Sequence, residues 1–137
     1  MALLVPNEGE LELLDNMLKE ATTADDAYEL KLYKNDKTPA NADAVANYTA
    51  ATFTNYTLRT LTRAGWNAAA DSAGVAETSY SSVQSWTCGA SGNTIYGYWV
   101  EAATSNNVLW AERFATSRVL AEGDVLNITP KFTLTTA

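Results

Sequence analysis

The stretch GNTIYGYWVEAATSNNVLWAERF, from Gly92 to Phe114, constrains the fold of this chain more than any other. It contains two runs of β-branched and aromatic residues joined by a polar connection, which is the pattern of a β-hairpin. Antiparallel sheets commonly have one apolar and one polar face, but here both faces of each run are apolar. The sequence therefore predicts a hairpin that is buried on two sides.

We place the connection at residues 102–107, which pairs Trp99 with Trp110 on one buried face. On the reverse face Tyr98 lies beside Ala111, and Tyr96 meets Arg113 closely enough for the guanidinium to lie over the ring. Another part of the same subunit or a neighbouring subunit covers this face. If a neighbouring subunit covers this face, Tyr96, Tyr98 and Arg113 form a subunit interface, because Tyr, Trp and Arg are favoured at interfaces.

One helix is expected near the N-terminus. Asn7 can cap it, Glu10 completes a capping box, and Leu11, Leu14 and Leu18 follow at helical spacing. This pattern predicts a helix over about residues 8–21. The apolar residues before it, Leu3, Leu4 and Val5, are expected to be buried under their own β-body or against a neighbouring subunit, and we favour the neighbour.

The rest of the chain has the period of two that is typical of strands. Residues 28–34 form a half-exposed strand with Tyr28, Leu30 and Leu32 on one face, and residues 125–135 form a strand that Pro130 interrupts. Further strands are expected within 47–66 and 80–89, with a loop at 35–44 and a loop or poorly paired edge at 67–79. The count is six to eight strands.

No βαβ pattern is present, so the fold class is mainly β: an antiparallel β-sandwich or partly open barrel with one N-terminal α-helix. At 137 residues the chain is the size of one domain. We expect a single domain over 1–137, in which the arm and helix take residues 1–22 and the β-rich body takes residues 28–137.

Charge and the length of the apolar runs argue against two classes of partner, nucleic acid and the membrane. There are 9 basic and 16 acidic residues, for a net charge of −7, and no basic patch that would match consecutive phosphates. Direct nucleic-acid binding is therefore not expected. No run approaches the roughly 20 apolar residues of a membrane span, and the N-terminus lacks a secretory pattern, so we expect no membrane partner and synthesis in the cytoplasm.

Catalytic groups are scarce. The chain has no histidine and one cysteine, Cys88, which we interpret as a small buried apolar group. We interpret the carboxylate of Glu101 as solvated at a strand end, whereas Glu112 faces inward and should either be paired, with Arg63 or Arg118, or lie at a wet seam. No catalytic residue, metal ligand or cofactor is expected, and the chain is not expected to be an enzyme.

Trp66 lies in the loop-like stretch RAGWNA, where a tryptophan beside glycine either plugs a loop or forms a binding hot spot. It is the final residue in our set of candidate partner-binding residues. The full set is Leu3, Leu4, Val5, Trp66, Tyr96, Tyr98 and Arg113.

Several motifs together resemble small structural proteins from the virions of tailed bacteriophages. They are the start MALLVPNEGELELLDNMLK, the turn WTCGA, the strands YGYWV and LWAERF, and the closing GD, L and TPKFTL elements of GDVLNITPKFTL. The resemblance covers most of the chain apart from residues 40–82. It implies a β-rich body after an N-terminal helix and a place in the virus particle.

The resemblance and the negative charge together favour a capsid decoration or cement protein, made in the host cytoplasm and located in the virion. Its partners would be the major capsid protein or other virion subunits, and it would be a homo-oligomer. The alternatives are another virion component, such as a tail, collar or baseplate protein, or a host-glycan-binding module that uses Trp66.

Overall fold

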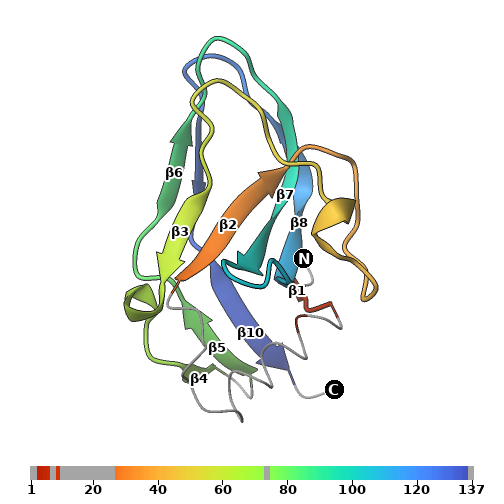
Figure 1. The fold of residues 1–137 in the computed structure, drawn as a ribbon. Helices are drawn as coiled ribbons and strands as arrows, with labels where there is room; N and C mark the ends of the chain where they lie inside the picture. The colour runs from red at the N-terminus through yellow and green to blue at the C-terminus, as the bar shows by residue number, and fades with distance from the viewer. Residues whose placement is uncertain (1–2, 7–8, 10–26, 73–74, 136–137) are drawn as a thin grey trace.

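The computed structural model describes residues 3–6, 9, 27–72 and 75–135. The chain is mainly β, and its sheets are antiparallel, as predicted (Figure 1). The largest sheet has five strands in the order β1–β8–β7–β2–β3 and does not close into a barrel. Its strands are β1 (Leu3–Leu4), β2 (Ala27–Tyr33), β3 (Arg59–Thr62), β7 (Thr94–Ala102) and β8 (Val108–Val119).

Two smaller sheets, β10–β5–β4 and β6–β9, form the rest of the β-structure. Their strands are β4 (Ala70–Ser72), β5 (Val75–Ser79), β6 (Gln84–Thr87), β9 (Val125–Ile128) and β10 (Lys131–Thr135). Pro130, which has no N–H for a strand ladder, separates β9 from β10, as predicted. The chain changes sheets at this point, because β9 pairs with β6 and β10 pairs with β5.

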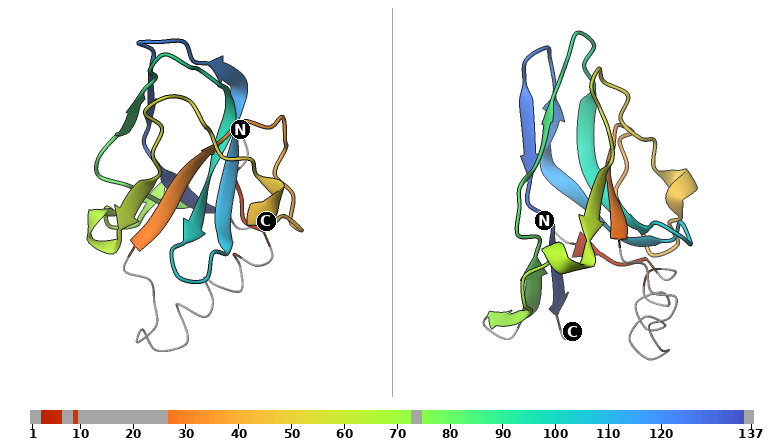
Figure 2. Two further views of the ribbon diagram at one scale, coloured as in Figure 1. Left: turned by 45° about the horizontal axis from the view of Figure 1, so that its top comes forward. Right: turned by 60° about the vertical axis from the view of Figure 1, so that its left-hand side comes forward.

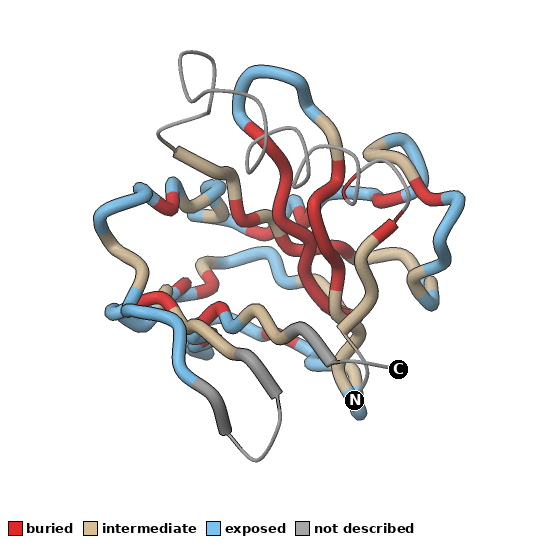
Figure 3. The backbone as a smooth tube through the Cα atoms, turned by 90° about the horizontal axis from the view of Figure 1, so that it is seen from below, coloured by how far each residue is buried: buried red, intermediate tan, exposed pale blue. Residues whose placement is uncertain are grey.

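One face of the β7–β8 hairpin packs against the smaller sheets. Tyr98, Val100 and Trp110 from the hairpin share a core with Trp86 of β6 and Leu126 of β9. The ribbon shows the β6–β9 sheet facing the hairpin (Figure 2). Each fully buried side chain of this size contributes roughly 1.5–3 kcal/mol of transfer free energy. Buried segments gather at the centre of the molecule, with exposed loops around them (Figure 3).

The reverse face of the hairpin is covered by the connection between β2 and β3. This connection contains the short 3₁₀ turn η1 (Val45–Asn47), and Tyr48, which follows η1, stacks on Trp99 with ring centroids 5.4 Å apart. Tyr33 of β2, together with Val108 and Ala111 of β8, completes this second core. The predicted burial on two sides is thus achieved within one subunit, and β2 is more buried than the expected half-exposed strand.

The predicted hairpin register is wrong by one residue. Trp99 pairs with Ala111, and Val100 pairs with Trp110. Because side chains alternate between the faces of a strand, Trp99 and Trp110 consequently lie on opposite faces.

A β-bulge in β8 explains this difference. Val100 pairs with Trp110 but Glu101 pairs with Val108, which leaves Leu109 as an extra residue on β8. Both Leu109 and Trp110 consequently reach the main core, whereas Val108 belongs to the second core. A second irregularity lies farther along the hairpin, between Ile95 and Gly97 on β7, and β8 is strongly curved (Figure 2).

Two other expectations concern segments away from the hairpin. Residues 67–79, expected as a loop or poorly paired edge, contain β4 and β5, and β5 is the central strand of its sheet. The predicted helix over residues 8–21 lies outside the described residues apart from the single position Gly9. Cys88 is buried in the main core, as predicted.

Candidate functional site

The N-terminal residues Leu3, Leu4 and Val5 lie on their own subunit. Leu3 pairs with Glu112 and Leu4 pairs with Ala111, so that β1 extends the five-stranded sheet beyond β8. All three residues are half-buried, and Leu3 and Val5 pack against the main core. This is the alternative that we favoured less, because two backbone pairings and the neighbouring core offer the arm a place within its own chain.

Tyr96 and Arg113 are brought together as predicted. The guanidinium carbon of Arg113 lies 5.4 Å from the centre of the Tyr96 ring. Arg113 also donates hydrogen bonds to the Lys37 carbonyl, at 2.8 Å, and to the carboxylate of Asp36, at 2.6 Å. The arginine therefore holds the β2–β3 connection against β8, and its hydrogen-bonding capacity is largely used within the chain.

Tyr98 does not share a surface with Tyr96. Its side chain is 3% exposed and faces the main core, where its hydroxyl donates to Glu112 at 2.5 Å. Burial, and then the neighbouring carboxylate, raise the pKa of Tyr98. Glu112 is therefore paired inside the fold as expected, but with a tyrosine instead of Arg63 or Arg118, and Tyr98 is out of reach of a partner.

Trp66 follows the 3₁₀ turn η2 (Arg63–Gly65) at the end of β3. Its ring meets Tyr80 edge-on at 5.5 Å, and Tyr80 is held by the hydrogen bond that the Thr62 amide donates to its hydroxyl, at 3.1 Å. A side chain at Gly65 would collide with the Tyr80 ring, which explains the glycine beside this tryptophan. Trp66 is thereby fixed in place and half-buried.

An aromatic pocket of about 250 Å³ lies beside Trp66 where β2, β5, β8 and β10 approach one another. Trp110 meets Trp66 at 5.7 Å and Phe132 at 5.0 Å, and these three rings provide much of the pocket wall. The complete lining is Tyr28, Arg63, Trp66, Thr78, Leu109, Trp110 and Phe132. From the sequence we selected only Trp66, because the other residues come from distant segments.

The indole N–H groups of Trp66 and Trp110 are buried, and neither has a hydrogen-bond partner among the described residues. The Trp110 indole lies near the Tyr98 hydroxyl but without good hydrogen-bond geometry. Such unsatisfied donors are uncommon in folded proteins. The pocket itself is walled mainly by aromatic rings, which suits a ligand with an apolar face.

Sequence reasoning missed a buried ionic group on the reverse face of the hairpin. Glu101, interpreted as solvated, is 1% exposed, and its charge is compensated because Lys31 of β2 reaches its Oε1 at 2.5 Å and the Trp99 indole donates to its Oε2 at 2.6 Å. Glu29 also contacts Lys31 at 2.7 Å. Burial by itself would lower the pKa of Lys31, but the two glutamates outweigh it and raise that pKa.

A second ion pair stabilises the β2–β3 connection. Asp43 contacts Lys37 at 2.8 Å and accepts hydrogen bonds from the Ala40 amide and the Tyr48 hydroxyl. Burial alone would raise the pKa of Asp43, but these partners outweigh burial and lower it. This group stabilises the segment that covers Trp99, whereas the Glu101 group joins β2 to β7.

The described residues contain no cluster of His, Cys, Asp and Glu that could hold a metal ion, and no helix long and apolar enough to cross a membrane. No known protein family matches the chain, and no curated protein is significantly similar to it.

Proposed function

We propose that this chain is a structural protein of a tailed-bacteriophage virion, most specifically a capsid decoration or cement protein. The observation that carries the proposal is the resemblance of its WTCGA, YGYWV and LWAERF segments to such proteins. In the fold, these segments form the end of β6 with the turn that follows it, and parts of the two strands of the central hairpin. The resemblance thus lies in the structural centre of the molecule.

The architecture that we infer is an open β-sandwich, because the main core lies between the five-stranded sheet and the smaller sheets. Such a rigid body suits a role based on contacts between subunits. Many copies, each burying a modest area across a boundary between capsid subunits, stabilise a shell by mass action. The net charge of −7 favours the outer surface, away from the packaged DNA.

The proposal is tested by mixing the purified protein with capsids that lack it and sedimenting the capsids. A cement protein co-sediments at a fixed ratio to the major capsid protein and raises the temperature at which the capsid releases its DNA. A protein that stays in the supernatant with correctly assembled capsids would contradict a role on the shell. Binding to isolated tails or baseplates in the same assay would favour the alternative virion role.

The aromatic pocket favours host-glycan binding as a second candidate function, because aromatic rings stack on sugars and nearby polar groups fix their orientation. A glycan array probed with the isolated protein tests this candidate. Binding that is lost in a Trp66→Ala variant but retained in an Arg59→Ala variant would support it. Arg59 is a matched control because it also lies against a tryptophan, Trp86, at another site.

A further inference from the structure

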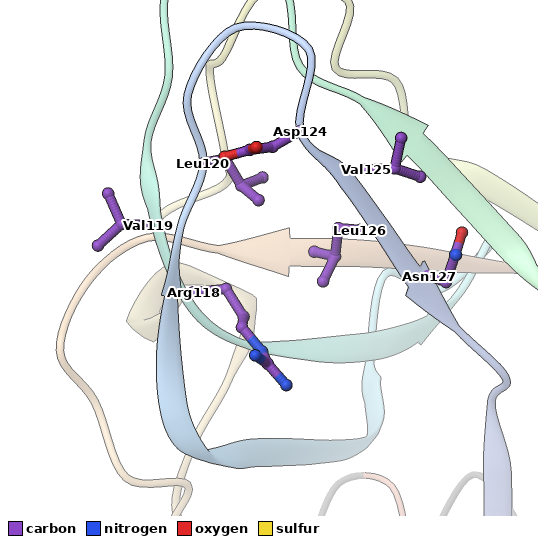
Figure 4. A pocket seen from close by; sticks show the side chains of 7 residues that line it. All are labelled: Arg118, Val119, Leu120, Asp124, Val125, Leu126 and Asn127. Atoms are coloured by element: carbon purple, nitrogen blue, oxygen red, sulfur yellow. The ribbon is translucent and has the colours of Figure 1, made fainter.

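A groove separates the C-terminal part of β8 from β9 (Figure 4). It contains two adjoining cavities of about 400 Å³ and 260 Å³, and both are lined by Arg118, Leu126 and Asn127. The turn at residues 120–124 closes one end, and the side chains of Arg118 and Leu126 extend into the gap between the strands (Figure 4). We call this space the β8–β9 groove.

Both strands that border the groove have a free edge. β8 pairs with β7 along one edge and with β1 along the other, but the β1 pairing involves only Ala111 and Glu112. β9 pairs with β6 and, among the described residues, with no other strand. Within β8, Arg118 and Val119 pair with β7, whereas the register shift between Ile95 and Gly97 leaves residues 115–117 without a strand partner among the described residues. Residues 115–119 and 125–128 therefore each present at least one edge whose backbone N–H and C=O groups can accept a further strand.

The groove also presents exposed aliphatic side chains. Val119 is 74% exposed and Val125 is 53% exposed, and both lie at the end of the groove near the turn. Leu126 and Ile128 also line the groove, but both are buried in the main core. The two exposed valines match a strand that carries aliphatic residues at alternate positions.

Arg118 is distinctive among the basic side chains. Of the described lysines and arginines, it alone has no ion pair, hydrogen bond or ring contact, whereas the others all have partners within the chain. The nearby carboxylate of Asp124 accepts a hydrogen bond from the Ala121 amide at 2.8 Å and forms no ion pair with Arg118. Arg118 thus leaves a positive charge in the groove of an acidic protein, and a carboxylate is its complement.

We propose that the β8–β9 groove binds an extended segment of a different virion subunit by β-strand addition, with a carboxylate of that segment paired to Arg118. The identity of the partner as a virion subunit rests on the proposed function, whereas the strand-binding chemistry does not. A different subunit is the better occupant than a second copy, because the aliphatic arm Leu3–Val5 already pairs and packs within its own chain.

A synthetic peptide tests the strand-binding chemistry on the full-length protein. The probe has about nine residues, the length of a long strand, with valine alternating with threonine and one central threonine replaced by glutamate. We expect amide hydrogen exchange at residues 115–119 and 125–128 to slow by about tenfold or more at saturating peptide, since new backbone hydrogen bonds protect these amides. A peptide with lysine in place of the glutamate should bind at least about tenfold more weakly.

Two charge-reversal variants provide the matched comparison. Arg118→Glu should lose binding of the glutamate peptide and gain binding of the lysine peptide, whereas Lys34→Glu, at a basic residue paired with Thr52 away from the groove, should behave as the unaltered protein. Circular dichroism checks that both variants fold. Unchanged exchange at both strands, or protection confined to other strands, would overturn the proposal.

Exchange measured in purified particles separates this proposal from the proposed function. Slower exchange at residues 115–119 and 125–128 in the particle than in the free protein is the expected result. Incorporation without such slowing would reject the groove and keep the virion role, whereas peptide binding by a protein absent from particles would reject the virion role and keep the groove. A free dimer with both edges already protected, dissociated by Arg118→Glu, would overturn the choice of occupant.

Discussion

Glu101 shows at the scale of one residue how a hairpin can be buried on both sides. Its carboxylate is buried on the reverse face of the hairpin, where it is satisfied by Lys31 and the Trp99 indole. Removing one member of a buried ion pair leaves the other without compensation. Glu29 remains beside Lys31 and moderates that loss.

We therefore predict that Glu101→Leu lowers the free energy of unfolding by about 3 kcal/mol. Combining it with Lys31→Met should cost less than the sum of the two single variants, with a coupling of roughly 1–3 kcal/mol. Denaturant unfolding of the four proteins measures this coupling.

The surface pair Lys131 and Glu77, at 2.5 Å, provides the control for this cycle. These side chains are 49% and 31% exposed, so the same pair of replacements should give a coupling below about 1 kcal/mol. Equal coupling energies for the two pairs would show that Glu101 is not buried as described.

Single residues also show what could not be predicted from the sequence. Glu101 is adjacent to the polar hairpin connection, and Lys31, its partner, lies 70 residues away along the chain. The signal that could have linked them is the period of two in β2, which places Glu29, Lys31 and the buried Tyr33 on one face. An ionic side chain on a face that also carries a buried tyrosine requires a partner of opposite charge.

Among the secondary-structure elements, β1 has the shortest pairing and its position is the easiest to test. Deletion of residues 2–6 removes both of its pairings with β8 and the contacts of Leu3 and Val5 with the core. We predict that the deletion lowers the free energy of unfolding by about 1–3 kcal/mol, from the apolar area that it exposes.

Thermal unfolding of the full-length and shortened proteins checks this prediction. Leu3→Ser should reproduce part of the loss, whereas Val83→Ser, at a side chain that is 57% exposed, should change stability by less than about 0.5 kcal/mol. A shortened protein with an unchanged melting temperature would show that the arm does not belong to the core of its own subunit.

Local patterns predicted several elements but not how they pair. The alternation in β2 and the interruption at Pro130 follow from the residues themselves, and both were predicted. The hairpin register was wrong because a bulge at Leu109 depends on packing against both cores. The aromatic pocket was missed for the same reason, since its walls come from segments that only the tertiary fold brings together.

The molecule as a whole should lose stability in alkaline solution. Burial raises the pKa of Tyr33 to about 12 from an ordinary value of 10.0, and burial also raises the pKa values of Tyr56 and Tyr98. A tyrosine whose pKa is higher in the folded state stabilises the fold below its unfolded pKa. That stabilisation is lost as the pH rises toward the folded pKa.

For Tyr33 alone, the shift corresponds to roughly 2–3 kcal/mol lost between about pH 10 and pH 12. The pKa of Lys31 is also raised, so Lys31 likewise loses its charge and its stabilising effect as the pH rises. Urea unfolding at increasing pH, followed by circular dichroism and tyrosinate absorbance, measures the effect. Tyr33→Phe should lose less stability on alkalinisation, and a denaturation midpoint that stays constant to pH 12 would contradict this prediction.

The central claim at the scale of the whole molecule is its place on the outer shell of a virus particle. Electron cryo-microscopy of purified particles, with quantitative mass spectrometry of their proteins, tests this claim most directly. We predict many copies in a fixed ratio to the major capsid protein, with density for this β-fold at boundaries between capsid subunits on the outer surface. Absence of the protein from purified particles would contradict the virion role, and its confinement to a few copies in the tail would contradict the role as a cement protein.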